Sequence, residues 1–214
     1  MLMSPRAADH VRSVDTASRL ASSAEGRADL VVLLDGARRP IGTAPREGVH
    51  GRDTPLHLAY SCWLLGPDGR FLLTRRALTK RSWPGVWTNS FCGHPRPGET
   101  MGSAVTRGGL HELGVEVEAV TPLLPDFSYR AVDANGTVEN EFCPVHLART
   151  TAALAPDPSE VAEHRWVEID ELRAALAAAP WALSPWLREQ AAQLDHRAWD
   201  LIRDHATDDR GVAS

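Results

Sequence analysis

The 214-residue sequence has few cysteines and no long apolar segment. Its three cysteines, Cys62, Cys92 and Cys143, have neither the number nor the spacing of a disulfide framework or a zinc finger. No apolar run reaches the roughly 20 residues that a membrane helix needs, and the N-terminus lacks the apolar stretch of a secretory signal. We therefore expect a cytoplasmic protein in a reducing environment that does not bind membranes.

An excess of positive charge is also missing. The chain has 23 Lys and Arg against 28 Asp and Glu, a net charge of −5. This balance argues against broad nucleic-acid binding but permits a local basic pocket. Hydrophobic residues make up 43% and charged residues 24%, which is typical of an ordinary globular domain.

The chain divides into a short first segment and one domain. Residues 1–27 are rich in Ala, Ser, Arg and Asp and have no sustained apolar period. We expect them to form a disordered tail, followed by a single domain over residues 28–214 that includes a C-terminal helix.

The pattern of the domain predicts strands first and helices last. Apolar or alternating stretches predict strands over residues 30–34, 56–65, 70–75, 115–123, 127–132, 137–147 and 163–168. A helix is expected over residues 101–113 with Gly114 as its stop, another after Asp170, and a longer one from Ser184-Pro185. This order predicts an α+β fold, a mixed β-sheet packed between helices.

Two carboxylates and three histidines form the first candidate site. Glu139 and Glu141 alternate on a predicted strand and so share one face. Alone they are typical of a solvated strand face, but their apolar neighbours favour burial, where unpaired carboxylates are costly. With His50, His57 and His94 they would give five N/O ligands, a set that suits Mn²⁺, Zn²⁺ or Fe²⁺ better than Ca²⁺.

A thiol and a basic cluster are the other candidates. Cys92 precedes His94 by two residues and is either an inert buried cysteine or a catalytic thiol. Arg75-Arg76 and Lys80-Arg81 form either a solvated loop or a cradle for phosphate oxygens.

Longer strings connect these candidates to a known family. Gly93, Glu99, Arg107, Glu112, Gly114 and Val115 match a degenerate Nudix box. Strings over residues 56–59, 74–77, 83–90, 92–95, 129–131, 139–141 and 180–186 resemble the type 1 isopentenyl-diphosphate isomerases, which have a Nudix-like fold. The resemblance covers about residues 29–192.

The resemblance implies a role for each matching residue. It implies that Cys92 and Glu141 are catalytic, with Tyr129 as a helper. The implied Mn²⁺ or Zn²⁺ ligands are His50, His57, His94, Glu139 and Glu141, and Glu112 would bind Mg²⁺. The implied substrate-binding residues are Arg46, Arg76, Lys80 and Trp186.

The activity implied is the interconversion of isopentenyl and dimethylallyl diphosphate by protonation and deprotonation, which supplies isoprenoid biosynthesis. The resemblance also implies a small-molecule diphosphate substrate and a monomer or weak homodimer. Two rivals stay open: a Nudix hydrolase of another diphosphate, and a non-catalytic metal-binding module.

Departures from the family pattern affect two regions. Gly108 and His111 replace two of the three carboxylates on the Nudix helix, which argues against hydrolysis. Gly108 also stands where the isomerases often have a basic residue, and Arg46 where lysine is common. The pair Gly108-Gly109 is expected to be a weak point of the helix, costing about 1 kcal/mol per glycine relative to alanine.

Overall fold

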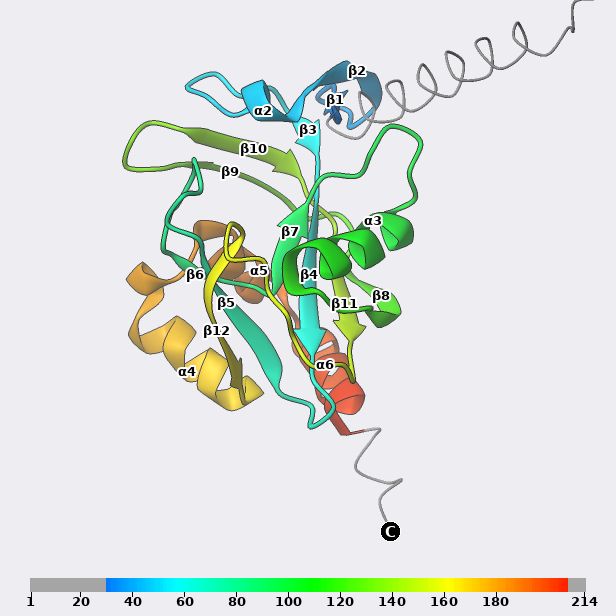
Figure 1. Cartoon of the computed structure of the whole chain (residues 1–214), viewed down its shortest axis with the longest axis vertical. Helices are drawn as coiled ribbons and strands as arrows, with labels where there is room; N and C mark the ends of the chain where they lie inside the picture. Colours follow the sequence, from blue (N-terminus) through cyan, green and yellow to red (C-terminus); the bar gives the residue numbers. More distant parts are fainter. Residues whose placement is uncertain (1–29, 208–214) are drawn as a thin grey trace, which may run out of the picture.

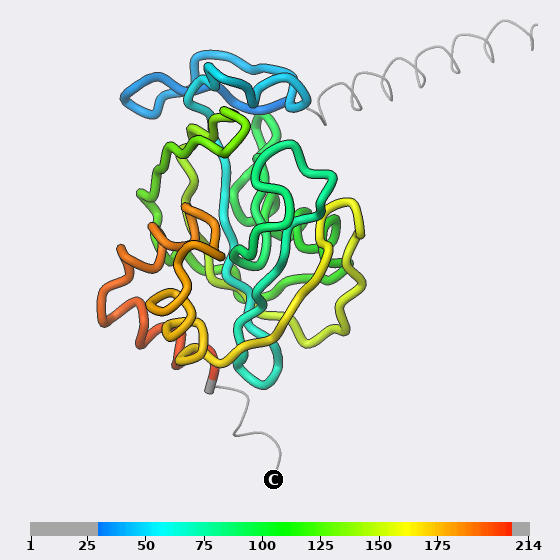
Figure 2. The backbone as a smooth tube through the Cα atoms, turned by 90° about the vertical axis from the view of Figure 1, so that its left-hand side faces the viewer, coloured from blue at the N-terminus to red at the C-terminus, as the bar shows by residue number. Residues whose placement is uncertain are grey.

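Two β-sheets share two continuous chain segments that cross from one sheet into the other. The computed structural model describes residues 30–207, so the predicted tail over residues 1–27 lies outside the described residues. The larger sheet has the strand order β12-β5-β4-β11-β8, with β6 beside β5 and β7 beside β4. The smaller sheet has the order β2-β1-β3-β10-β9 and forms one end of the molecule with the loop after β2 (Figures 1 and 2).

The strands are short, between two and seven residues long. Those of the smaller sheet are β1 Leu30–Leu34, β2 Pro40–Pro45, β3 His57–Leu58, β9 Ser128–Val132 and β10 Val138–Phe142. Those of the larger sheet are β4 Tyr60–Leu65, β5 Phe71–Arg76, β6 Trp87–Thr88, β7 Phe91–Gly93, β8 Glu118–Leu124, β11 Val145–Arg149 and β12 Val161–Val167.

Two predicted strands are each divided between the sheets. The run over residues 56–65 breaks at Ala59 into β3 and β4, and the run over residues 137–147 breaks at Cys143-Pro144 into β10 and β11. The two runs pair in parallel on both sides of the break, β10 with β3 and β11 with β4. The fold therefore bends both segments together, and the bend places the ends of β3, β7 and β10 around one point.

Helices cover both faces of the larger sheet, as the sequence predicts (Figure 1). Alternating side chains on β4 show this directly, because Trp63 and Leu65 pack in the cluster with Leu172, Leu187 and Ile202 of the C-terminal helices. Their neighbours Tyr60, Cys62 and Leu64 pack instead against Ala104, Val105 and Leu113. The helices are α2 Arg46–Val49, α3 Met101–Gly108 with a π-helical turn over Gly109–Leu113, α4 Ile169–Ala178, a 3₁₀ turn over Pro180–Ala182, α5 Pro185–Gln193 and α6 His196–Thr207.

Two helix predictions need correction. The long helix expected from Ser184 is two helices, because Asp195 accepts a hydrogen bond from the backbone N–H of Ala198 and caps a new start. The helix after β12 begins at a capping box of Glu168 and Glu171 rather than at Asp170. Among the described residues, no helix is long and apolar enough to cross a membrane.

Candidate active site

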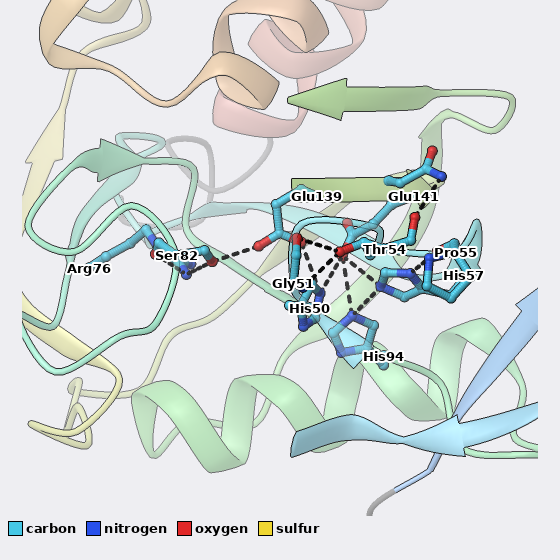
Figure 3. A network of polar contacts seen from close by, with 11 residues as sticks. His50, Gly51, Thr54, Pro55, His57, Arg76, Ser82, His94, Glu139 and Glu141 are labelled. Carbon is cyan, nitrogen blue, oxygen red and sulfur yellow. Dashed lines mark hydrogen bonds and ion pairs between the residues drawn. The ribbon is translucent and has the colours of Figure 1, made fainter. Parts of the chain in front are cut away.

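Three imidazoles and one carboxylate meet at the bend between the sheets. His57 on β3 pairs in register with Glu141 on β10, while His50 follows α2 and His94 follows β7 (Figure 3). Glu141 Oε1 lies 3.4 Å from the Nε2 of His57, 3.2 Å from that of His94 and 3.9 Å from that of His50. One potential ligand atom from each of the four residues lies within 4.8 Å of every other.

The chemistry of this cluster fits a divalent metal. The Nδ1 of His57 lies 2.9 Å from the carbonyl oxygen of Pro55, which only accepts, so Nδ1 carries the proton and the lone pair of Nε2 faces the cluster. The buried Nε2 of His50 lies 2.9 Å from Glu139 Oε2 in a geometry that makes no hydrogen bond, so its lone pair is free for a metal. Two atoms about 2.1 Å from one metal lie about 3.0–3.4 Å apart in octahedral or tetrahedral geometry. Glu141 Oε1 has this separation from the Nε2 atoms of His57 and His94.

Glu139 lies at the edge of this cluster. Its Oε2 is 2.9 Å from His50 Nε2, and its Oε1 accepts a 2.6 Å hydrogen bond from Ser82 Oγ. The structure therefore brings all five predicted ligands together, four in a tight group and Glu139 beside His50. Both Glu139 and Glu141 are buried, so the alternative of a solvated strand face is wrong.

The electrostatics of the cluster favour a protonated His50 beside an ionised Glu141. Burial opposes the charge of His50, but the close approach of the Glu139 and Glu141 carboxylates outweighs burial and raises its pKa to about 9. Burial also opposes the charge of Glu141, but the three histidines hold its pKa well below the usual value. A cation at this position would replace the proton on His50 as the counter-charge of the carboxylates.

A cavity of about 340 Å³ opens beside the cluster. It is lined by the predicted catalytic side chains Cys92, Tyr129 and Glu141 and by Trp186. The predicted substrate-binding cations also line it, namely Arg46, Arg76 and Lys80. A thiol, a phenol and a carboxylate thus share one hollow with three cations and an aromatic ring.

The comparisons with known proteins agree with this arrangement. A family model described as the NUDIX domain matches residues 55–189. An isopentenyl-diphosphate Delta-isomerase of Agromyces mediolanus is 59% identical over 167 residues, 78% of this chain and 81% of the relative. Proteins of the same name from Frankia alni and Brevibacterium linens are 57% and 52% identical, over 81% and 83% of this chain and 89% and 95% of theirs. The chain belongs to the isopentenyl-diphosphate Delta-isomerase family of NUDIX proteins.

The family assignment confirms the resemblance and the fold predicted from the sequence motifs. A crystal structure from Deinococcus radiodurans aligns with a TM-score of 0.57 at 22% identity, over 82% of this chain and 98% of that one. A MutT NUDIX hydrolase from Burkholderia pseudomallei aligns with a TM-score of 0.50 at 25% identity, over 65% of this chain and 98% of that one. These two likenesses support the NUDIX fold, and the isomerase branch rests on the sequence relatives.

Two side chains that contact Cys92 in this isomerase-family chain have no role assigned from the sequence motifs. Asn89 is fully buried, and its Nδ2 lies 3.2 Å from Cys92 Sγ, while Ser61 Oγ lies 3.4 Å from the same sulfur. Burial raises the pKa of the Cys92 thiol to about 12, although both contacts act to lower it. The signal that could have identified Asn89 is its place in one of the strings that resemble the family, three residues before Cys92.

Two cations of the cavity, Lys80 and Arg76, already have partners. Lys80 Nζ forms an ion pair with Glu160, and burial lowers the pKa of Lys80. The guanidinium of Arg76 donates to Ser82 and lies 5.4 Å from the centre of the Trp186 ring. A bound anion would compete with Glu160 for Lys80.

Glu112 is not among the residues that line the cavity, but it interacts electrostatically with the cavity cations. Burial raises the pKa of Glu112, and Lys80, Arg76 and Arg46 oppose that rise. The carboxylate therefore lies within electrostatic reach of these three cations.

The glycine pair on the NUDIX helix is a packing requirement rather than a weak point. A Cβ on Gly108 would lie 1.9 Å from the hydroxyl oxygen of Tyr60, and one on Gly109 would lie 2.7 Å from Val117 Cγ1. The helix can approach β4 and the segment before β8 only without these side chains, which is why alanine is not favoured here despite its helix propensity.

Proposed function

We propose that this protein interconverts isopentenyl diphosphate and dimethylallyl diphosphate for isoprenoid biosynthesis. The observation that carries the proposal is the single cavity that Cys92 and Glu141 line together with Arg46, Arg76 and Lys80. Such a cavity offers two proton-transfer groups and an anchor for an anion. The isomerase family of the chain supplies the substrate class.

The reaction needs an acid and a base on either side of a small hydrocarbon. Protonation of the terminal alkene carbon gives a tertiary cation. Loss of a proton from the methylene carbon on the other side of the cationic centre then gives the allylic isomer. We assign Glu141, with Tyr129 beside it, as the acid and Cys92 as the base. The raised pKa of Cys92 and the lowered pKa of Glu141 favour the reverse order, in which Cys92 donates a proton and Glu141 accepts one; both orders use the same two groups. Each positioned group contributes about 10²–10⁴-fold to the rate.

The cations would anchor the diphosphate while the hydrocarbon lies deeper. Arg76 and Lys80 bind phosphate oxygens in this proposal, and Arg46 adds a third positive charge at the cavity wall. Binding energy from the diphosphate then orients an alkene that has no polar group of its own.

Trp186 would stabilise the tertiary cation. Its side chain is buried at 3% exposure and lines the cavity, so its ring face meets the hydrocarbon without water. A desolvated cation over an indole ring gains about 2 kcal/mol. The same ring excludes the water that would otherwise trap the cation.

Two metals are part of the proposal. His50, His57, His94, Glu139 and Glu141 would hold a Mn²⁺ or Zn²⁺, and Glu112 would hold a Mg²⁺ that also contacts the diphosphate. When bound, the first metal fixes the orientation and tunes the acidity of the carboxyl group, and the second neutralises phosphate charge.

The decisive experiment incubates the pure protein with isopentenyl diphosphate, Mg²⁺ and Mn²⁺ and identifies the products. Dimethylallyl diphosphate without release of phosphate supports the proposal. Release of inorganic phosphate or pyrophosphate would indicate a NUDIX hydrolase instead, and absence of any product would indicate a non-catalytic metal-binding module.

A further inference from the structure

Ser82, a buried serine that is not one of the five predicted metal ligands, contacts Glu139, the ligand at the edge of the cluster. Ser82 lies in the loop between β5 and β6 and is only 6% exposed. Its Oγ donates a 2.6 Å hydrogen bond to Glu139 Oε1 on β10 (Figure 3), and both residues line the cavity. The contact joins residues 57 positions apart and links a loop between two strands of the larger sheet to β10 of the smaller sheet.

The other side of Ser82 faces a cation. Arg76 Nε and Nη2 donate to the carbonyl oxygen of Ser82 at 3.2 and 2.9 Å, and Nη2 lies 3.3 Å from Oγ. A guanidinium only donates and an ionised carboxylate only accepts, so the serine proton must point to Glu139. Arg76 polarises the hydroxyl in the direction that strengthens this hydrogen bond.

The hydrogen bond fixes a rotation that the glutamate itself leaves free. The terminal torsion of a glutamate carboxylate is broad, so one contact at Oε2 does not define how the group is turned. With Ser82 on Oε1, the Oε2 atom is held 2.9 Å from His50 Nε2. Loss of the hydroxyl would leave one carboxylate oxygen buried without this donor.

We propose that Ser82 is a positioning residue that orients Glu139 toward the metal cluster and ties it to the anion-binding Arg76. The inference rests on the proposed metal role of the His50, His57, His94, Glu139 and Glu141 group. Outer partners of metal ligands typically contribute about 10–100-fold to metal affinity. Ser82 therefore acts on the metal through Glu139 and does not touch the substrate.

The test measures Mn²⁺ affinity by calorimetry on full-length protein freed of metal by chelation. Ser82→Ala should bind Mn²⁺ about 10–100-fold more weakly than the unmodified protein. Ser82→Thr, which keeps the hydroxyl, should restore most of the affinity. The matched control is Ser90→Ala: Ser90 is also buried and makes two short hydrogen bonds, to Leu72 O and from Leu64 N, but its partners lie outside the cluster. It should lower the melting temperature without changing Mn²⁺ affinity.

The outcomes separate this inference from the proposed function. If the unmodified protein does not bind Mn²⁺ or Zn²⁺, the metal site itself fails. If it binds and Ser82→Ala binds equally well, or if Ser90→Ala weakens binding as much, Ser82 has no positioning role. Should Ser82→Ala not fold, Ser82→Cys decides, because a thiol of similar size donates only weakly and should lower the affinity in the same direction.

Discussion

The indole Nε1 of Trp186 donates a 2.9 Å hydrogen bond to Asn89 Oδ1, and both side chains are buried. The Nδ2 of the same amide lies 3.2 Å from Cys92 Sγ. One side chain therefore orients the aromatic ring and the thiol at once. This relationship fixes the distance between the group that would stabilise a cation and the group that would take its proton.

Two substitutions of Trp186 should distinguish the effect of its ring face on kcat from the effect of its hydrogen bond to Asn89. Trp186→Phe keeps an aromatic face and loses the contact to Asn89, which should lower kcat by about 2–10-fold, the value of one ordinary hydrogen bond. Trp186→Leu also loses the ring face, about 2 kcal/mol, and should lower kcat by about 30-fold or more. Steady-state kinetics of both variants test this order, and equal loss in the two would contradict a role for the ring face.

The metal cluster should depend on its most buried ligand. His57→Ala removes a fully buried imidazole whose Nδ1 contact with the Pro55 carbonyl oxygen directs Nε2 into the cluster. We expect a large loss of both metal content and activity, measured by elemental analysis and product assay. Full metal occupancy in a Glu139→Ala, Glu141→Ala double variant would contradict the proposed coordination.

Much of the fold could be predicted because apolar patterning decides it. The run over residues 30–34 is a strand as predicted, and Gly114 ends its helix with a φ of 67°. The divided strands could not be predicted, because nothing in the apolar pattern around Ala59 records that the chain moves from one sheet to the other. The short strands β6 and β7 also lie in sequence with strong turn signals, where tertiary pairing overrides local preference.

The candidate site was accessible from the sequence only where residues carry recognisable chemistry. His50, His57, His94, Glu139 and Glu141 could be listed, but their convergence depends on the parallel pairing of β3 and β10. The supporting contacts of Asn89 and Ser82 arise from tertiary packing that no spacing reveals. The close approach of Gly108 to Tyr60 is likewise a property of two surfaces and cannot be read from one helix.

The glycine at position 108 should be needed for stability. In Gly108→Ala the new Cβ would lie 1.9 Å from the Tyr60 hydroxyl oxygen, so the helix or the ring must shift. Overpacking of this kind costs about 1–3 kcal/mol, which should lower Tm by several degrees. Tyr60→Phe in the same chain removes that oxygen and should recover part of the loss, as calorimetric unfolding of the double variant would reveal. An unchanged Tm in Gly108→Ala would contradict the packing explanation.

Lys80 should contribute to substrate binding more than to chemistry. Lys80→Met removes a cation from the cavity wall, and a hydrogen bond to a charged group is worth about 1.5–3 kcal/mol, so KM should rise about 10- to 100-fold. Arg203→Met is the matched control, because it removes one positive charge from an exposed ion pair with Asp200 on α6. A larger fall in kcat than rise in KM would place Lys80 in the chemical step instead.

The central claim is that Cys92 and Glu141 move protons to and from carbon, and isotope incorporation tests it most directly. The reaction is run in deuterated water, and the dimethylallyl diphosphate is examined by mass spectrometry. We predict solvent deuterium in the product methyl group, and a fall in turnover of about 10²–10⁴-fold in Cys92→Ala with the metal content unchanged. Product without deuterium, or undiminished turnover in Cys92→Ala, would contradict the account.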